Sequence, residues 1–143
     1  MNAQTTASEL VIDRQLDLRA PIERVWRALT DEHELARWFP KTAELAAEQG
    51  ADGWLDWGDL ERHAIRVEAF DPPRRLVWRW AREASTPLDQ AQTTLVEWTL
   101  EPLAADRTRL VLHESGFAAP EHHRGNSDGW DEELAKLVSF VES

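Results

Sequence analysis

The chain has 143 residues, of which 27 are acidic and 16 are basic, and its formal net charge at pH 7 is −11. This negative charge argues against nucleic-acid binding and against an anionic membrane surface as partner, because both contacts depend on Lys and Arg. The length favours a single domain over residues 1–143, and a composition of 42% hydrophobic and 30% charged residues is typical of a globular protein.

The composition also bears on cellular location. Cysteine is absent, which excludes disulfides, thiolate nucleophiles and zinc–thiolate sites. The first ten residues show neither the basic nor the apolar segment of a signal peptide, and apolar runs are too short to span a bilayer. We therefore expect a cytoplasmic protein in which residues 1–8 form a flexible N-terminal segment.

The first periodic segment, residues 10–18, predicts a half-buried strand. Leu10, Ile12, Leu16 and Leu18 share one face at a period of two, with polar residues opposite. Arg14 lies on the same apolar face and is its one polar exception.

Two short helices are predicted after this strand. Pro21 suits a first helical position, and an apolar stripe follows it at helical spacing: Ile22, Val25, Trp26 and Leu29. Asp31, with Glu34 three residues later, has the form of a capping box that opens the second helix. Pro40 is expected to end that helix.

The middle of the chain predicts antiparallel strands joined by short connections. Alternating patterns occur near residues 54–57, 63–69, 76–81, 96–100 and 109–113, with a turn at residues 71–73. His63, Ile65, Val67 and Ala69 form one of the inward rows. We therefore expect a run of about six strands after the two helices, in addition to the first strand.

A long amphipathic helix is predicted at the end, capped by Ser127 or Asp128. Its apolar stripe consists of Trp130, Leu134, Leu137, Val138 and Val141. A curved antiparallel sheet must cover its apolar face, and this helix is the obvious cover. The element order therefore predicts an α+β domain.

Motifs for catalysis or metal binding fail on spacing. Two His-Glu pairs begin the metalloprotease pattern HExxH, but Arg37 and Phe117 stand where the second His is required. The adjacent His122 and His123 could bind a metal ion, although solvated loop histidines are the better explanation. The sequence therefore predicts no metal, no cofactor and no catalytic residue.

Four segments, in order, resemble bacterial homologues of the activator of heat shock protein 90 ATPase. They read APIERVWRALTD with LARWF, DPPRRLVW, TRLVLHESGF and GW. The resemblance covers residues 10–141 and implies the START-like (SRPBCC) superfamily. Its helix-grip fold is a curved seven-stranded antiparallel sheet around a long C-terminal helix, with two short helices after the first strand. In that superfamily the cavity between sheet and helix binds lipids, sterols, polyketides or plant hormones, and some branches catalyse cyclisation.

Candidate site residues follow from this fold. The first and last strands are neighbours in it, so Arg14 and Glu114 are expected to approach each other, either as a ligand anchor or as a structural ion pair. His63 is expected near the cavity mouth, as a ligand contact or as a satisfied rim residue.

Aromatic residues supply the other candidates, since the chain has eight Trp and no Tyr. This indicates either an aromatic-rich core or a cavity for a flat ligand. Three tryptophans fall on the inner strand faces and are candidate stacking walls: Trp78, Trp80 and Trp98. Of Trp54 and Trp57, one must point outward. The remaining tryptophans are expected to pack helices onto the sheet: Trp26, Trp38 and Trp130.

The favoured function is binding of a small hydrophobic or aromatic molecule in a Trp-lined cavity. One alternative is a cyclase- or aromatase-like enzyme, for which Arg14, Glu114 and His63 are the only plausible proton-moving residues. A second alternative is a co-chaperone-like protein-interaction module, which would present an exposed apolar patch to its partner.

Overall fold

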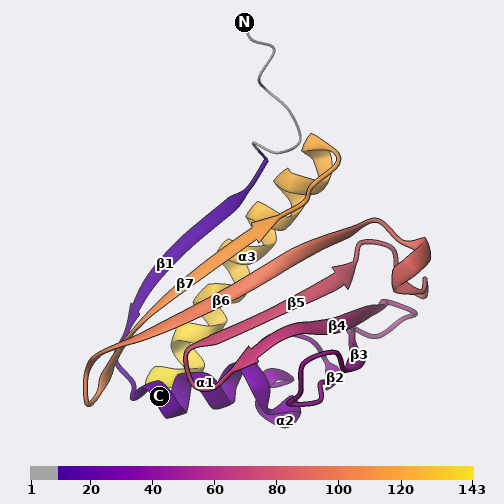
Figure 1. Ribbon diagram of the computed structural model, residues 1–143. Coiled ribbons are helices and arrows are strands. Elements are labelled where there is room, and N and C mark those ends of the chain that lie inside the picture. Colours follow the sequence, from indigo (N-terminus) through magenta and orange to yellow (C-terminus); the bar gives the residue numbers. More distant parts are fainter. Residues whose placement is uncertain (1–9) are drawn as a thin grey trace, which may run out of the picture.

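The computed structural model describes residues 10–143, in which an open seven-stranded antiparallel sheet carries a long helix on one face (Figure 1). The strands are β1 (Ile12–Leu18), β2 (Thr42–Glu44), β3 (Asp52–Asp56), β4 (Arg62–Asp71), β5 (Arg75–Ala81), β6 (Thr93–Ala104) and β7 (Arg107–Ser115). The helices are α1 (Ile22–Thr30), α2 (Glu32–Leu35), α3 (Pro120–Glu142) and a short 3-10 helix, η2 (Leu88–Gln90). The α+β architecture predicted from the sequence is confirmed.

The strand order is β1-β7-β6-β5-β4-β3-β2, so β2 to β7 form a meander in which each strand pairs with the next. The first and last strands lie side by side, as the family resemblance implied, with Ile12 opposite Glu114 and Leu18 opposite Thr108. The strand at the other edge of the sheet, β2, has three residues. A segment this short shows too little alternation to be recognised from the sequence.

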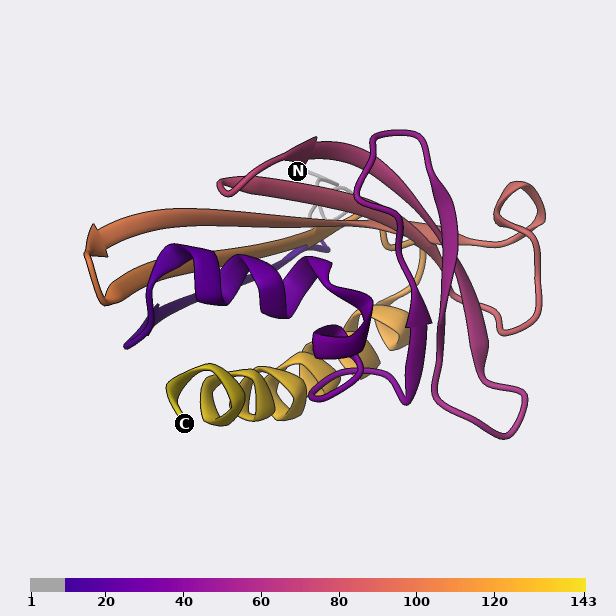
Figure 2. The ribbon, with the colours of Figure 1, turned by 90° about the horizontal axis from the view of Figure 1, so that it is seen from below.

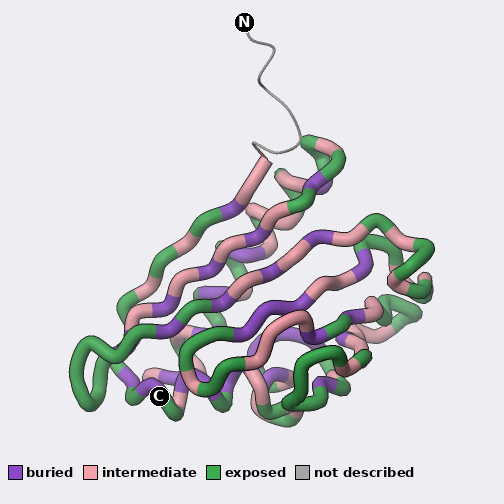
Figure 3. The backbone as a smooth tube through the Cα atoms, in the orientation of Figure 1, coloured by how far each residue is buried: buried purple, intermediate pink, exposed green. Residues whose placement is uncertain are grey.

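Burial alternates along the strands and defines the inner face of the sheet (Figure 3). In β7 the buried residues are Thr108, Leu110, Leu112 and Glu114, so a carboxylate occupies a position in an otherwise mainly apolar row. In β4 the register shifts between Val67 and Ala69. This bulge changes the phase of the strand, and Phe70 rather than Ala69 packs inward, 5.5 Å from the ring of Trp26.

The two short helices form where they were predicted. The apolar stripe of α1 is buried, and Asp31 caps α2 by accepting hydrogen bonds from the backbone N–H groups of His33 and Glu34. Trp38 is buried and donates its indole N–H to the carbonyl of Ala28 at 2.8 Å. Figure 2 shows α1 and α3 on the same side of the sheet.

The last helix begins earlier than predicted, at Pro120 rather than after a cap at Ser127 or Asp128. Proline at the first position is preorganised for a helix. His122 and Asn126 also extend the stripe of Trp130 toward the N-terminus at intervals of four residues, and His122 is buried. Because these two residues are polar, the apolar pattern in the sequence hides the first turns. Within residues 10–143, no helix has the length and hydropathy to cross a bilayer.

Candidate functional site

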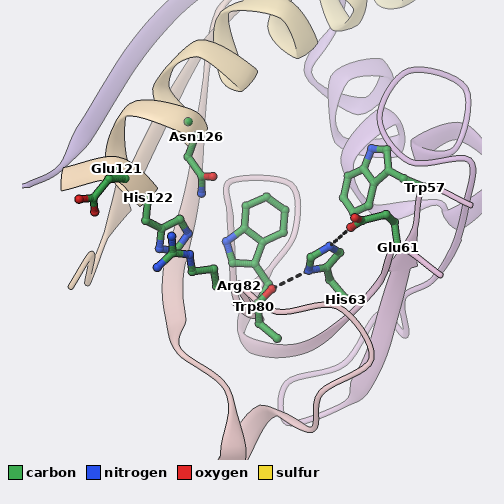
Figure 4. A pocket seen from close by; sticks show the side chains of 10 residues that line it. Trp57, Glu61, His63, Trp80, Arg82, Glu121, His122 and Asn126 are labelled. Atoms are coloured by element: carbon green, nitrogen blue, oxygen red, sulfur yellow. Dashed lines mark hydrogen bonds and ion pairs between the residues drawn. The ribbon is translucent and has the colours of Figure 1, made fainter. Parts of the chain in front are cut away.

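A cleft opens between the first half of α3 and the adjoining ends of β4 and β5 (Figure 4). Its main chamber has a volume of about 540 Å³ and a smaller side chamber about 190 Å³. Both chambers are lined by Trp57, Trp80, Gly125 and Asn126. The main chamber adds Glu61, His63, Ala81, Arg82, Glu121 and His122, and the side chamber adds Phe39, Gly129, Trp130 and Glu133.

Aromatic walls distinguish this cleft from other surface depressions. One beside Arg19 and another beside Pro73 have similar volumes, about 530 and 570 Å³, but none of their lining residues is aromatic. Ligand sites in proteins combine apolar or aromatic walls with a few polar groups. The cleft beside α3 is therefore the candidate site.

Two glycines of α3 leave room for the cleft. A Cβ added at Gly125 or Gly129 would have nothing within 4 Å. The later part of the helix instead packs large apolar side chains, Leu134, Leu137 and Val141, into the core. The second half of the helix thus contributes large side chains to the core, whereas the two glycines of the first half leave open space beside the cleft.

The aromatic walls are packed against one another. Trp80 stacks on Trp130 with ring centroids 5.7 Å apart and an interplanar angle of 22°. Phe39 stacks on Trp130 at 5.2 Å and meets Trp57 edge-on, also at 5.2 Å. Such contacts stabilise aromatic pairs beyond their buried area. These contacts hold the aromatic side chains of the cleft in place.

A buried carboxylate lies directly behind these walls. Glu114 is 0% exposed. Its Oε1 accepts a hydrogen bond from Trp130 Nε1 at 2.7 Å. Its Oε2 accepts from Thr94 Oγ1 at 2.5 Å, Asn126 Nδ2 at 2.9 Å and Trp80 Nε1 at 3.0 Å. All four partners donate, which matches the acceptor-only ionised carboxylate.

Three of these four partners line the cleft: Trp80, Asn126 and Trp130. Glu114 itself is not among the lining residues, so it acts on the cleft through its neighbours. Its hydrogen bond from Asn126 Nδ2 fixes the orientation of that amide, so that Asn126 Oδ1 points away from the carboxylate. The carboxylate is a positioning residue for one wall of the cleft.

His63 lies at the rim of the cleft, with a side chain 17% exposed. Its Nδ1 is 2.9 Å from the carbonyl oxygen of Ala81, which can only accept, so this nitrogen carries a hydrogen. Its Nε2 is 3.0 Å from a carboxylate oxygen of Glu61 (Figure 4). Both ring nitrogens of His63 are therefore already occupied.

On the α3 side of the cleft, His122 is buried against the ring of Phe117, with centroids 4.9 Å apart. Burial lowers the pKa of His122 from its ordinary value of 6.5, and the charge of Arg82 lowers it further, against the opposite effect of Glu83. His122 is thus a neutral ring at neutral pH.

The other predicted site residues lie outside the cleft lining. Trp78 and Trp98 are fully buried, one layer deeper, where they contact each other at 5.9 Å. The expected approach of Arg14 to Glu114 is wrong. Arg14 Nε donates to Asp131 at 2.8 Å and its Nη2 to Ser127 Oγ at 2.8 Å, because its side chain extends from β1 to α3.

Of the two tryptophans left open by the sequence, Trp57 lines the cleft and Trp54 packs under the guanidinium of Arg62, 3.7 Å from its ring centroid. Sequence reasoning missed Arg82, His122 and Asn126. The four-residue spacing of His122, Asn126 and Trp130 was the available signal for two of them. Within residues 10–143, we find no group of three or more His, Cys, Asp or Glu side chains arranged to hold a metal ion.

Comparison with known proteins identifies relatives of this fold. The model of the family described as "Activator of Hsp90 ATPase homolog 1-like protein" matches residues 19–142. The chain therefore belongs to this family, as the sequence resemblance indicated. A comparison with curated proteins gave no match.

Several solved structures have a similar fold. DynU16, a protein in the dynemicin biosynthetic locus, is 26% identical with a TM-score of 0.80; the match covers 94% of this chain and 48% of DynU16, so the chain spans about half its length. Protein MLL2253 from Mesorhizobium loti is 25% identical with a TM-score of 0.77, covering 92% and 96% of the two chains. CalU16 from Micromonospora echinospora is 25% identical with a TM-score of 0.75, covering 92% and 75%.

Proposed function

We propose that this member of the Activator of Hsp90 ATPase homolog 1-like family binds a small aromatic molecule in the cleft between α3 and the sheet. The observation that carries the proposal is the rigid aromatic wall of Trp80 and Trp130, both held by the buried carboxylate of Glu114. A flat ring entering the cleft would meet Trp57 and Trp80 in both chambers. Preorganised walls lower the entropic cost of binding, because their side chains are already ordered.

The relatives support this proposal. DynU16 is a protein in a biosynthetic locus, which is consistent with a small-molecule ligand for the fold. Fold similarity by itself does not fix a function. The argument therefore depends on the cleft of this chain.

Binding is favoured over the cyclase-like alternative. The three residues expected to move protons are not assembled, because Arg14 is bonded to Asp131, whereas Glu114 is held behind the cleft wall. The protein-interaction alternative also has less support. Among residues 10–143, the exposed large apolar side chains are Leu60 and Leu103, which lie on different hairpins.

The test is a titration of ¹⁵N-labelled protein with 2-naphthamide, a neutral aromatic probe, followed through the indole N–H signals. We expect the signals of Trp57 and Trp80 to shift with saturation, and that of Trp54 to stay in place. The variant Trp57→Ala should weaken binding, whereas the matched variant Trp54→Ala should not. Absence of saturable shifts, or shifts confined to tryptophans outside the cleft, would overturn the proposal.

A further inference from the structure

His122 presents polar atoms that the protein itself leaves without a partner. The residue is 8% exposed and lines the main chamber (Figure 4). Within residues 10–143, its ring nitrogens have no hydrogen-bond partner, unlike those of His63 and His123, which bond to Ala81 and Val11. Because the ring lines the main chamber, a ring nitrogen without a partner in the protein is open to a polar group of a ligand in the cleft.

Arg82 stands at the same end of the cleft. In the described part of the chain its guanidinium makes one hydrogen bond, to Gln92 Oε1 at 3.4 Å, and no ion pair with a carboxylate within 4.0 Å. Several arginines of the sheet are paired with acids, as Arg79 is with Glu68 and Arg66 with Asp52. Arg82 therefore offers a free cation to the cleft.

The start of α3 is a third feature that favours an anion at this end of the cleft. This 23-residue helix begins beside the main chamber, which Glu121 and His122 line. Its N-cap is Ala119, which has no side-chain acceptor for the first backbone N–H groups. The N-terminus of a helix carries a partial positive charge that favours anions.

We propose that the aromatic ligand carries a carboxylate, which pairs with the guanidinium of Arg82 and accepts a hydrogen bond from the ring of His122. This inference rests on the proposed function, because it names the chemical class of ligand for the same cleft. The aromatic part of the molecule lies against Trp80 and Trp57, and its acidic end lies toward the first turn of α3.

Two acidic residues also line the main chamber. Glu61 is 3.0 Å from His63 and is engaged with that ring on the β4 side. Glu121 is exposed at the first turn of α3, a position where the helix N-terminus itself stabilises a carboxylate. Neither is bonded to Arg82 or to His122. Arg82 and His122 are therefore available to a ligand carboxylate.

The experiment compares 2-naphthoate with 2-naphthamide, which differ in charge and share their ring system. Calorimetry should show naphthoate binding about tenfold more tightly, as expected for a hydrogen-bonded charge at a partly open site. Arg82→Gln should abolish this preference, measured as the ratio of the two affinities within the same variant. Arg124→Gln, which removes the same charge from an exposed position on α3, should keep it.

The outcomes separate the two proposals. Binding of both probes with equal affinity, or tighter binding of the amide, would overturn the carboxylate assignment and leave the aromatic cleft standing. A preference for naphthoate that persists in both Arg82→Gln and His122→Gln would overturn the assignment of these residues. Failure of both probes to bind would overturn the proposed function together with this inference. Urea unfolding of each variant distinguishes lost binding from lost folding.

Discussion

Nε1 of Trp130 donates a hydrogen bond of 2.7 Å to Oε1 of Glu114, joining the middle of α3 to the end of β7. The bond serves two purposes in one place. It satisfies an indole N–H that the helix buries, and it satisfies one oxygen of a carboxylate that has no exposed surface. Helix and sheet are thereby aligned at the boundary between the core and the cleft.

The variant Glu114→Gln tests this alignment. Glutamine replaces one acceptor oxygen by an NH₂ group, which would face the hydrogen-bond donors around Glu114 and leave them without an acceptor. We therefore expect the free energy of unfolding to fall by about 2–4 kcal/mol. The matched variant Glu97→Gln, on the outer face of the sheet where Glu97 pairs with Arg75 at 2.8 Å, should lose about 1 kcal/mol or less. Urea denaturation measures both. Equal losses would show that the buried network adds nothing beyond a surface pair.

Arg14 is expected to matter for stability and not for binding. Arg14→Met breaks the contacts with Asp131 and Ser127 and should lower the free energy of unfolding by about 1 kcal/mol. The affinity for 2-naphthamide should stay within about twofold of wild type, since Arg14 does not line the cleft. In an Asp131→Asn background the same change should cost less. A large loss of affinity with stability intact would place Arg14 at the ligand instead.

Replacing Gly125 of the cleft by alanine should raise the stability of the protein and weaken ligand binding. Gly125→Ala adds a methyl group toward open space and should stabilise the helix by about 0.5–1 kcal/mol. Because Gly125 lines both chambers, the same methyl should weaken 2-naphthamide binding. Ser139→Ala, at an exposed position of α3, controls for helix propensity alone. Calorimetry and thermal unfolding check the pair, and unchanged affinity in Gly125→Ala would contradict a ligand in contact with this wall.

The lowered pKa of His122 predicts a pH dependence of stability. In the unfolded chain the ring binds a proton near pH 6.5, whereas in the folded chain it does so at lower pH. The unfolded state therefore binds more protons in this range, so the stability contributed by neutral His122 is complete above pH 6.5 and is lost as pH falls through the folded pKa. Burial of the ring is the main cause of the lowered pKa; the charge of Arg82 lowers it further and that of Glu83 opposes the shift.

Unfolding midpoints at pH 7.5 and pH 5 should consequently differ more for wild type than for His122→Gln. The other histidines titrate in both proteins, so the comparison isolates His122. The same dependence in the two proteins would contradict a neutral buried ring.

Much of the fold could be predicted because its signals are local. The stripe of α1, the cap at Asp31 and the alternation in β6 and β7 each depend on residues close together in the sequence. The start of α3 could not, because its inward residues His122 and Asn126 are polar. The bulge in β4 also escaped, since it depends on pairing with β5 rather than on the residues of β4 alone.

The site was harder to predict for a physical reason. Strand alternation correctly assigned Trp80 and Glu114 to the inner face, but it does not say at what depth a side chain lies. Trp98 and Glu114 share that face, and the first is core whereas the second borders the cleft through its partners. Strand order alone suggests Glu114 as the partner of Arg14, but α3 lies over β1 and supplies Asp131 instead.

The pairing of β1 with β7 has a consequence for how the chain folds during synthesis. Asp13 and its partner His113 are 100 residues apart, whereas every pairing among β2 to β7 joins strands that are consecutive in the chain. As the chain leaves the ribosome, the meander can form strand by strand, but β1 waits for the last strand to emerge. Contacts of such long sequence separation slow folding. We expect the edge of β7 to remain open until β1 docks, which makes this the step at which a chaperone or a second unfolded chain competes.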